Sequence, residues 1–121
     1  MRNHKSLEVW QQAMELVKLT YLVSASFPKV EQFGLTSQMR RAAVSVPSNI
    51  AEGVARGTTK EYVHFLNIAR GSLSELDTQF EISKMLGFVE DNHSVFQQLE
   101  NVARLLTGLH RAMSMKVRAG R

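Results

Sequence analysis

Two pairs of acidic and imidazole side chains recur in the sequence with the same spacing. Glu61-x-x-His64 and Glu90-x-x-His93 both match the Glu-x-x-His element that holds paired metal ions in helical bundles. Such a site needs both pairs at one level of the core, together with two further glutamates. If the pairs begin two antiparallel helices, they lie about 30 Å or more apart, at a rise of ~1.5 Å per residue. We therefore interpret both glutamates as first-turn acids favoured by the helix dipole, and we predict no metal site.

Other patterns typical of catalysis or cofactor binding do not occur in the sequence. The 121 residues include no cysteine, which excludes thiol catalysis and cysteine-ligated zinc. No two histidines are four residues apart, and Gly53-x-x-x-Gly57 lacks the Lys-Ser/Thr that completes a phosphate-binding loop. No serine has a base at a recognisable spacing. The sequence therefore predicts a protein that uses no cofactor and is not an enzyme.

Apolar residues spaced by three and four predict four helices, over residues 7–26, 35–56, 59–86 and 92–115. We expect Ser6 to cap the first helix, Thr58-x-x-Glu61 to form a capping box on the third, and Asp91 or Asn92 to cap the fourth. The short connections favour an all-α fold, an antiparallel up-down-up-down four-helix bundle. This bundle is a single domain over residues 1–121, and residues 116–121 form a frayed basic tail.

Two features of these helices carry further expectations. Pro47 lies inside the second helix, where we predict a kink and not a chain reversal, because the apolar period continues in register across it. The expected core stripe of the first helix is Leu7, Trp10, Met14, Val17 and Tyr21. Other apolar residues fall off the main stripes and predict a second buried face, and hence self-association: Leu16, Leu19, Val23, Ala43, Ala51, Leu66 and Ile68.

The net charge of +4 is unevenly distributed along the chain. Residues 104–121 contain five basic residues and no acid, and a bundle brings this segment to the same pole as the N-terminus and the turn after the second helix. Basic ends are a common way to hold an acidic polymer, although a solubilising tail has the same composition. The candidate nucleic-acid-binding residues are Arg2, Lys5, Arg56, Lys60, Arg111, Lys116, Arg118 and Arg121.

A polar stripe follows one face of the second helix, at spacings of four, four, three and four. Folding the third helix back about Gly57 places Arg41 level with Glu75, and Ser45 level with residues 70–72, so we predict an Arg41–Glu75 ion pair. A small-ligand or partner site is one interpretation of the stripe, but we favour a structural network that sets the register of the helices. Its members are Arg41, Ser45, Asn49, Glu52, Arg70, Ser72 and Glu75.

The second helix also carries a recognisable string. Residues 34–53, GLTSQMRRAAVSVPSNIAEG, followed by Arg56, resemble the signature of the four-helix-bundle family encoded in intervening sequences of bacterial 23S rRNA genes. Residues 60–75 resemble a second block of that family. The resemblance implies a homo-oligomer, which we expect to be a pentamer, and similarity to the accessory variability protein of diversity-generating retroelements, a basic bundle that binds nucleic acid and a reverse transcriptase. Val54-Ala55 stands where an aromatic-glycine pair is common in the family.

These observations lead to two hypotheses about function. The first is a non-enzymatic, oligomeric bundle that binds nucleic acid, RNA rather than DNA, through phosphate contacts from the basic pole. The second is a protein–protein scaffold whose partner is a polymerase or a ribosome-associated protein. No stretch of the sequence is long and apolar enough for a membrane span, and no signal peptide is evident, so we expect a cytoplasmic protein.

Overall fold

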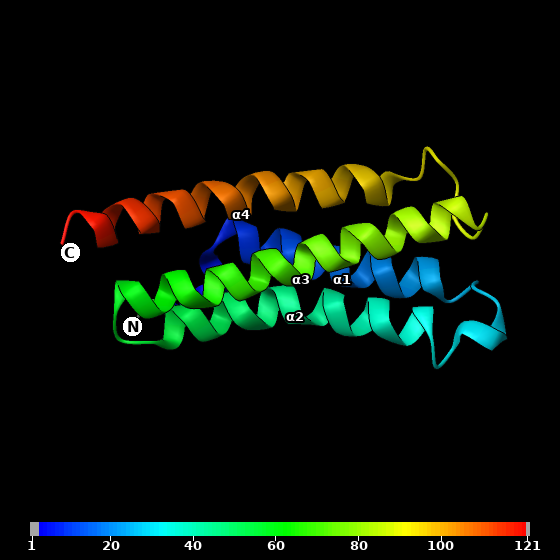
Figure 1. Cartoon of the computed structure of the whole chain (residues 1–121), viewed down its shortest axis with the longest axis horizontal. Coiled ribbons are helices and arrows are strands. Elements are labelled where there is room, and N and C mark those ends of the chain that lie inside the picture. Colours follow the sequence, from blue (N-terminus) through cyan, green and yellow to red (C-terminus); the bar gives the residue numbers. More distant parts are fainter. Residues whose placement is uncertain (1–2, 121) are drawn as a thin grey trace.

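A computed structural model describes residues 3–120 of the chain. It contains four long helices, α1 (Glu8–Ser24), α2 (Leu35–Ala55), α3 (Thr59–Met85) and α4 (Ser94–Arg118), and no strand within the described range. The short 3-10 turns η1 (His4–Ser6) and η2 (Lys29–Glu31) precede α1 and α2. Consecutive helices contact each other, and α4 closes on α1, whereas neither diagonal pair of helices is in contact. The prediction of an antiparallel four-helix bundle is confirmed (Figure 1).

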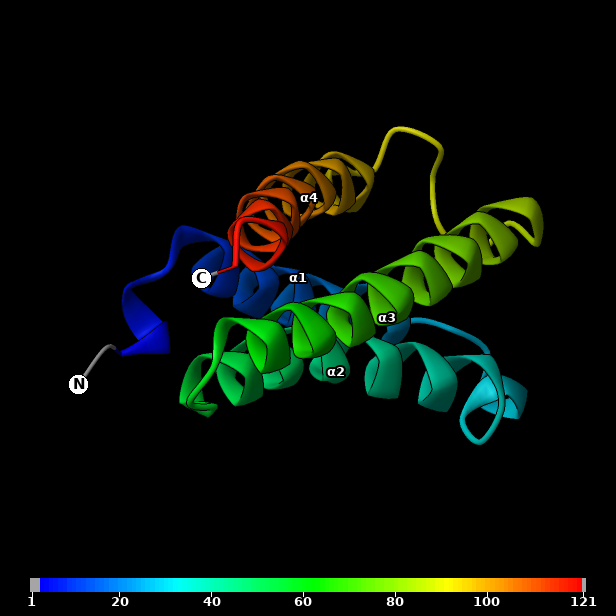
Figure 2. The same ribbon diagram turned by 60° about the vertical axis from the view of Figure 1, so that its left-hand side comes forward.

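The antiparallel order gives the bundle two distinct ends. At one end α2 turns into α3, and α4 finishes beside this turn; we call this the α2–α3 end. At the other, the α3–α4 end, α1 leads through η2 into α2, and α3 leads into α4. Figure 2 shows the N-terminal η1 turn and the last turn of α4 both at the α2–α3 end. The topology therefore gathers three parts of the chain that are distant in sequence: η1, the turn between α2 and α3, and the end of α4.

The core fills the space between the helices with aliphatic side chains, Met39 and two phenylalanines, Phe27 and Phe80. Val46 and Ile50 of α2, Leu66 and Leu76 of α3, and Phe80 of α3 are fully buried. Burying each large side chain contributes about 1.5–3 kcal/mol. The α2–α3 pair makes the most extensive contact of the bundle. These two helices therefore form the rigid half on which the site residues of the α2–α3 end depend.

The expected core stripe of the first helix is wrong in part: Leu7, Trp10 and Val17 are partly buried and pack against the core, but they are not its centre. Residues Val9, Ala13, Leu16, Thr20 and Val23 are buried in α1, whereas Met14 and Tyr21 are exposed. The core face is rotated because α1 packs against both α2 and α4. This face includes Thr20, whose hydroxyl donates to the Leu16 carbonyl at 2.8 Å and so keeps a hydrogen-bond partner when it is buried.

This rotation also removes most of the sequence argument for a second apolar face. Leu16, Val23, Ala43 and Leu66 are buried within the monomer, so they offer nothing to a neighbouring subunit. Only three of the off-stripe residues keep accessible surface, and they are Leu19, Ala51 and Ile68. Of the predicted second face, only these three side chains are therefore available to an oligomer interface.

Helix α2 runs without interruption through Pro47, so the prediction that the chain does not reverse there is confirmed. Proline cannot donate to the carbonyl four residues earlier, which weakens the helix at this turn. Two side chains donate to neighbouring carbonyls: the Ser48 hydroxyl to Val44 at 2.7 Å and the Asn49 amide to Ser45 at 2.8 Å. Pro47 is itself buried in the bundle, where its ring packs as an apolar residue.

The helix ends agree with the sequence in the third helix and differ elsewhere. Thr58 caps α3, accepting from the Glu61 backbone N–H at 3.1 Å, and Gly87 adopts a positive φ of 80° after its last turn. The predicted caps of the first and fourth helices are wrong. Ser6 lies in η1 and Leu7 caps α1 with no side-chain hydrogen bond, while His93 caps α4 through its ring nitrogen, which accepts from Val95 at 3.0 Å.

The expected basic tail is largely helical. Helix α4 continues to Arg118, three residues beyond the predicted end, so Lys116 and Arg118 have defined positions on it. Cations in the last turn interact favourably with the negative end of the helix dipole, which helps to hold this turn.

Candidate nucleic-acid interface

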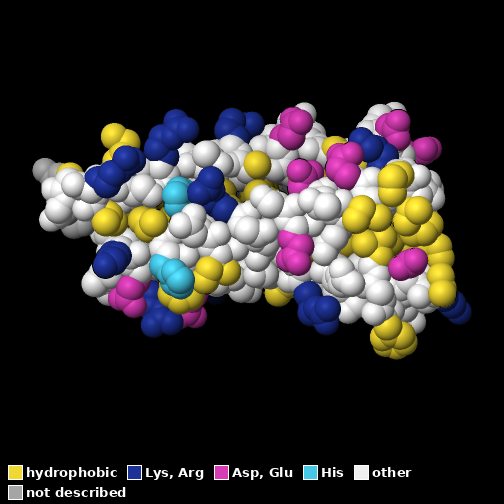
Figure 3. Space-filling view, viewed as in Figure 1, with side chains coloured by type: hydrophobic (Ala, Val, Ile, Leu, Met, Phe, Trp, Pro, Cys, Tyr) yellow, Lys and Arg dark blue, Asp and Glu magenta, His cyan; other side chains and the backbone are white. Residues whose placement is uncertain are grey.

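The C-terminal half of α4 presents basic side chains to solvent. Residues 101–118 contain no acid, and Arg104, Arg111 and Arg118 are all exposed. Within residues 3–120 none of these three guanidinium groups has a carboxylate within 4.0 Å. Figure 3 shows Lys and Arg side chains over this part of α4, and acidic side chains mainly toward the other end of the bundle. Unpaired cations on a helix of this kind can contact phosphate groups.

Further candidates lie around the same end. Lys60 is exposed in the first turn of α3, Lys116 in the last turns of α4, and Lys5 in η1. None of these lysines has an ion-pair partner within the part of the chain that the structure describes. Arg2 and Arg121, the other two residues predicted from sequence, lie outside the described residues.

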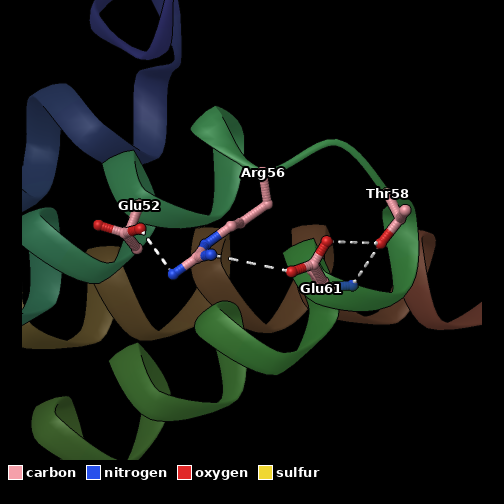
Figure 4. Close-up of polar contacts among 4 residues, drawn as sticks. All are labelled: Glu52, Arg56, Thr58 and Glu61. Atoms are coloured by element: carbon pink, nitrogen blue, oxygen red, sulfur yellow. Dashed lines mark hydrogen bonds and ion pairs between the residues drawn. The ribbon is translucent and has the colours of Figure 1, made fainter.

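Arg56 differs from the other candidates because its charge is paired. Its guanidinium lies 3.0 Å from Glu52 and 3.9 Å from Glu61, and it covers the Phe65 ring at 4.8 Å from the centroid. Figure 4 shows Arg56 between these two carboxylates, beside Thr58, whose hydroxyl donates to Glu61 at 3.2 Å. Arg56 therefore ties the end of α2 to the start of α3, and two carboxylates compete with any phosphate for it.

Acidic side chains dominate the region between α3 and α4 at the other end. Burial, with Glu81 and Glu100 nearby, raises the pKa of Asp77 above its ordinary value. Lys84 lies 3.0 Å from Glu81 and covers the Phe96 ring, so one cation offsets part of this charge. The charge of this region is therefore opposite in sign to that of the exposed cations of α4.

The predicted polar stripe of α2 forms a smaller network than expected. The Ser45 and Ser72 hydroxyls lie 2.7 Å apart, which links α2 to α3 at the expected level. Asn49 donates to the Ser45 hydroxyl at 2.9 Å. Glu52 instead pairs with Arg56, as described above. The half-buried Ser45–Ser72–Asn49 cluster is therefore a structural contact that fixes how α2 and α3 align.

The predicted Arg41–Glu75 ion pair does not form. Both side chains line the same shallow cavity of about 300 Å³ beside Ser72, so the two residues are near each other, as the register implies. Both are exposed, however, and an exposed ion pair gains little over two hydrated charges while costing side-chain entropy. Solvation therefore competes successfully with pairing at this position.

Arg70 also departs from the expected network, because it turns toward α4. Its guanidinium donates to Asn67 at 3.1 Å and to His110 Nδ1 at 3.3 Å. Since a guanidinium only donates, Nδ1 must accept, and the proton of the neutral ring is on Nε2. Nε2 is buried with no hydrogen-bond partner among residues 3–120. Burial and the positive charge of Arg70 both lower the pKa of His110 below 6.5.

The lowered pKa of His110 predicts a specific dependence of stability on pH. The folded protein favours the neutral ring, so this contribution is complete above pH 6.5 and is lost as the pH falls below 6.5 toward the folded-state pKa. We expect His110→Gln to remove this loss. Urea unfolding of the wild type and of His110→Gln at about pH 8 and about pH 5.5 measures whether this loss is removed. If the wild type and the variant differ in unfolding free energy by the same amount at both pH values, the result contradicts the lowered pKa of His110 in the folded protein.

The two Glu-x-x-His pairs lie far apart in the bundle. Glu61 and His64 are in the first turns of α3, at the α2–α3 end, whereas Glu90 and His93 precede α4 at the other end. His93 is used as the cap of α4, and Glu61 interacts with Thr58 and Arg56. Within the described residues no three His, Asp or Glu side chains are grouped closely enough to hold a metal ion.

A protein-family model, described as "23S rRNA-intervening sequence protein", matches residues 5–108. This chain belongs to that family. The match covers most of the chain and includes all of α1, α2 and α3. No curated relative matches the sequence. The family resemblance predicted from the second helix is therefore confirmed.

The family match divides the candidate interface into two parts. Lys60 and Arg104 lie inside the matched range, whereas Arg111, Lys116 and Arg118 lie beyond residue 108. The most basic part of α4 therefore lies beyond the residues that the model of the 23S rRNA-intervening sequence family matches. No helix formed by residues 3–120 is both long and apolar enough to cross a membrane.

Sequence reasoning missed two residues that the structure makes important. Arg104 was not among the candidates, although Arg104, Arg111 and Arg118 recur every seven residues and therefore share a helix face. Gly53 was considered only as part of a failed phosphate-loop pattern. It is buried where α2 meets α3, and a glycine within a helical pattern was the available signal of close packing.

Proposed function

We propose that this member of the 23S rRNA-intervening sequence family is a non-enzymatic protein that binds RNA through its α2–α3 end. The observation that carries the proposal is the set of exposed cations without carboxylate partners in α4 and at the start of α3. The family description, which refers to ribosomal RNA, favours RNA over DNA as the polyanion. Contacts of this kind position a protein on phosphates without reading sequence, so recognition depends on shape and charge.

Binding of this kind has a measurable salt dependence. Each phosphate contact releases condensed counterions, so affinity falls as salt rises. We expect the protein to bind structured RNA at about 50 mM salt and more weakly at about 200 mM, with a modest sequence preference. Fluorescence anisotropy with a labelled RNA duplex at both concentrations tests this. No binding at the lower concentration, or an affinity independent of salt, would refute the proposal.

We also propose that the protein acts as a homo-oligomer, as a ring of five subunits. The buried off-stripe residues no longer support this, but other apolar side chains remain exposed along the sides of the bundle, namely Met14, Val44 and Ile68. A closed cyclic arrangement of parallel bundles aligns all α2–α3 ends on one side of the ring. Each subunit then adds its cations to one surface, which raises the avidity for a long polyanion.

Assembly should respond to salt in the opposite sense to RNA binding. Aligned basic ends repel one another, so we expect the ring to be weaker at low salt and tighter when salt screens the charges or RNA neutralises them. Multi-angle light scattering at two salt concentrations, with and without RNA, measures this. The expected particle has five times the subunit mass of 13.7 kDa. A particle near 13.7 kDa under all conditions would exclude both the ring and its avidity.

A second candidate function is a protein–protein scaffold, and one surface feature favours it. Large apolar side chains gather at the α3–α4 end (Figure 3), where Val30, Phe33 and Met85 are 87%, 91% and 76% exposed. Clusters of this kind commonly mark sites of protein contact. The RNA titration separates the two functions, because a scaffold with this docking surface does not require RNA binding at low salt.

A further inference from the structure

The basic residues of α4 form a straight line along the outer side of the helix. Arg104, Arg111 and Arg118 are each seven residues apart, and seven residues rotate a helix by almost two full turns, with a drift of about 20°. At ~1.5 Å per residue, adjacent arginines are separated by about 10.5 Å along the axis, and the line is about 21 Å long. The buried residues Val102 and Leu106 face the opposite side. The line therefore points away from the core.

A glycine interrupts this line at a place where the monomer does not need one. Gly108 lies inside α4 between Arg104 and Arg111, and a Cβ atom added there would meet no atom within 4 Å. Its backbone is helical, so no positive φ requires glycine either. Glycine in a helix interior is less stable than alanine, so the folding of the monomer does not explain it. Close approach of another molecule to the helix backbone does explain it.

The side chains beside Gly108 fit a phosphate backbone. Thr107 offers an exposed hydroxyl, which can bond a phosphate oxygen or a ribose 2′-hydroxyl. Of the phenylalanine, tyrosine and tryptophan residues, none follows Phe96 in α4, and the His110 ring is held against Arg70. Single-stranded nucleic acid is usually held by stacking its bases on exposed aromatic rings. The face therefore suits a double helix better than a single strand.

We propose that α4 docks lengthwise on the phosphate backbone of double-stranded RNA, with Arg104, Arg111 and Arg118 contacting phosphates and Gly108 at the point of closest approach. The inference rests on the proposed function and adds to it which helix makes the contact and which form of RNA it binds. The turn between α2 and α3 contributes less, because Arg56 is held by Glu52 and Glu61.

A charge-matched comparison tests the arginine line. The triple variant Arg104→Gln, Arg111→Gln, Arg118→Gln removes three charges from α4, and the control Lys18→Gln, Lys29→Gln, Arg41→Gln removes three exposed, unpaired charges elsewhere. Each lost duplex contact lowers the salt slope by about 0.9, so three contacts lower it by about 2.7. Raising the salt from about 50 to about 200 mM should therefore weaken the binding of the wild type by a factor that is about 40 times larger than the factor for the α4 variant, for each subunit that binds.

The outcomes separate this inference from the proposed function. The probes are an RNA duplex of about 20 base pairs, one of its strands alone, and the DNA duplex of the same sequence. Loss of affinity and slope in the α4 variant, with little change in the control, supports the inference. Equal losses of affinity in both variants overturn the inference but leave the proposed RNA binding intact. Tighter binding of the single strand or of the DNA duplex than of the RNA duplex also overturns the inference. Failure of the wild type to bind any probe at low salt overturns the proposed function itself.

Gly108→Ala supplies an independent test that does not alter charge. We expect this variant to unfold at a higher urea concentration than the wild type, because alanine favours the helix and the added methyl group meets no atom of the monomer. The same methyl group should weaken duplex binding severalfold by holding the phosphate backbone away from α4. A more stable variant with unchanged affinity would overturn the close approach at Gly108.

Discussion

Phe80→Ala should cost about 3–5 kcal/mol of unfolding free energy, the largest effect we expect of any single substitution in this bundle. Phe80 is 0% exposed and its ring meets Phe96 of α4 edge to face, with centroids 6.0 Å apart. Truncation removes the ring and leaves a cavity that the four helices cannot close by small shifts. Since single domains are stable by about 5–15 kcal/mol, this loss is a large share of the total.

Urea unfolding at one fixed protein concentration measures this effect, because assembly would otherwise shift the midpoint. Phe33→Ala is the matched control: it makes the same chemical change at a side chain that is 91% exposed, before α2 begins. We expect it to change the free energy by less than about 0.5 kcal/mol, with the same dependence on denaturant. Equal losses in the two variants would mean that Phe80 is not in the core.

The sequence predicted the helices well because their signals are local. The Thr58-x-x-Glu61 cap and the glycine after Leu86 depend only on neighbouring residues, and both appear in the structure. The core face of α1 was mispredicted because it depends on contacts with two other helices. Both Leu16 and Met14 are apolar, and only the packing of α1 decides that Leu16 is buried and Met14 is exposed.

The candidate site was harder to predict, since side-chain pairing depends on hydration as well as on register. The alignment of α2 and α3 places Ser45 against Ser72, within the level of residues 70–72 that spacing predicted. It also brings Arg41 near Glu75, but spacing cannot show that both remain hydrated and unpaired. The ion pair between Arg56 and Glu61 spans the turn between α2 and α3, so it depends on where the first turn of α3 lies relative to the end of α2. The sequence thus predicted where charged residues gather, but it did not predict which of them form ion pairs.

Gly53→Ala should destabilise the bundle by forcing α2 and α3 apart where they pack tightly. A Cβ atom at this position would lie 2.8 Å from Cδ1 of Tyr62, 3.2 Å from Cβ of Phe65 and 3.3 Å from the Tyr62 carbonyl oxygen. A rotation of the Tyr62 ring relieves only the first contact, whereas the Phe65 Cβ and the Tyr62 carbonyl oxygen are fixed by the backbone of α3, so the two helices must shift by a few tenths of an ångström. Overpacking of this kind costs about 1–3 kcal/mol, which alanine offsets in part by favouring the helix over glycine.

Gly71→Ala separates the packing cost from the helix preference, because it makes the same change inside α3 where an added Cβ meets nothing within 4 Å. That variant should gain about 0.5–1 kcal/mol, so the two unfolding free energies should differ by about the full overpacking cost of 1–3 kcal/mol. Urea unfolding of both variants beside the wild type measures the difference. If Gly53→Ala is as stable as Gly71→Ala, α2 and α3 are not in tight contact at Gly53. Because Arg56 and Glu61 join the same two helices next to this contact, loosening it should also separate Arg56 from Glu61, whereas the pair with Glu52 lies four residues away on α2 and should remain.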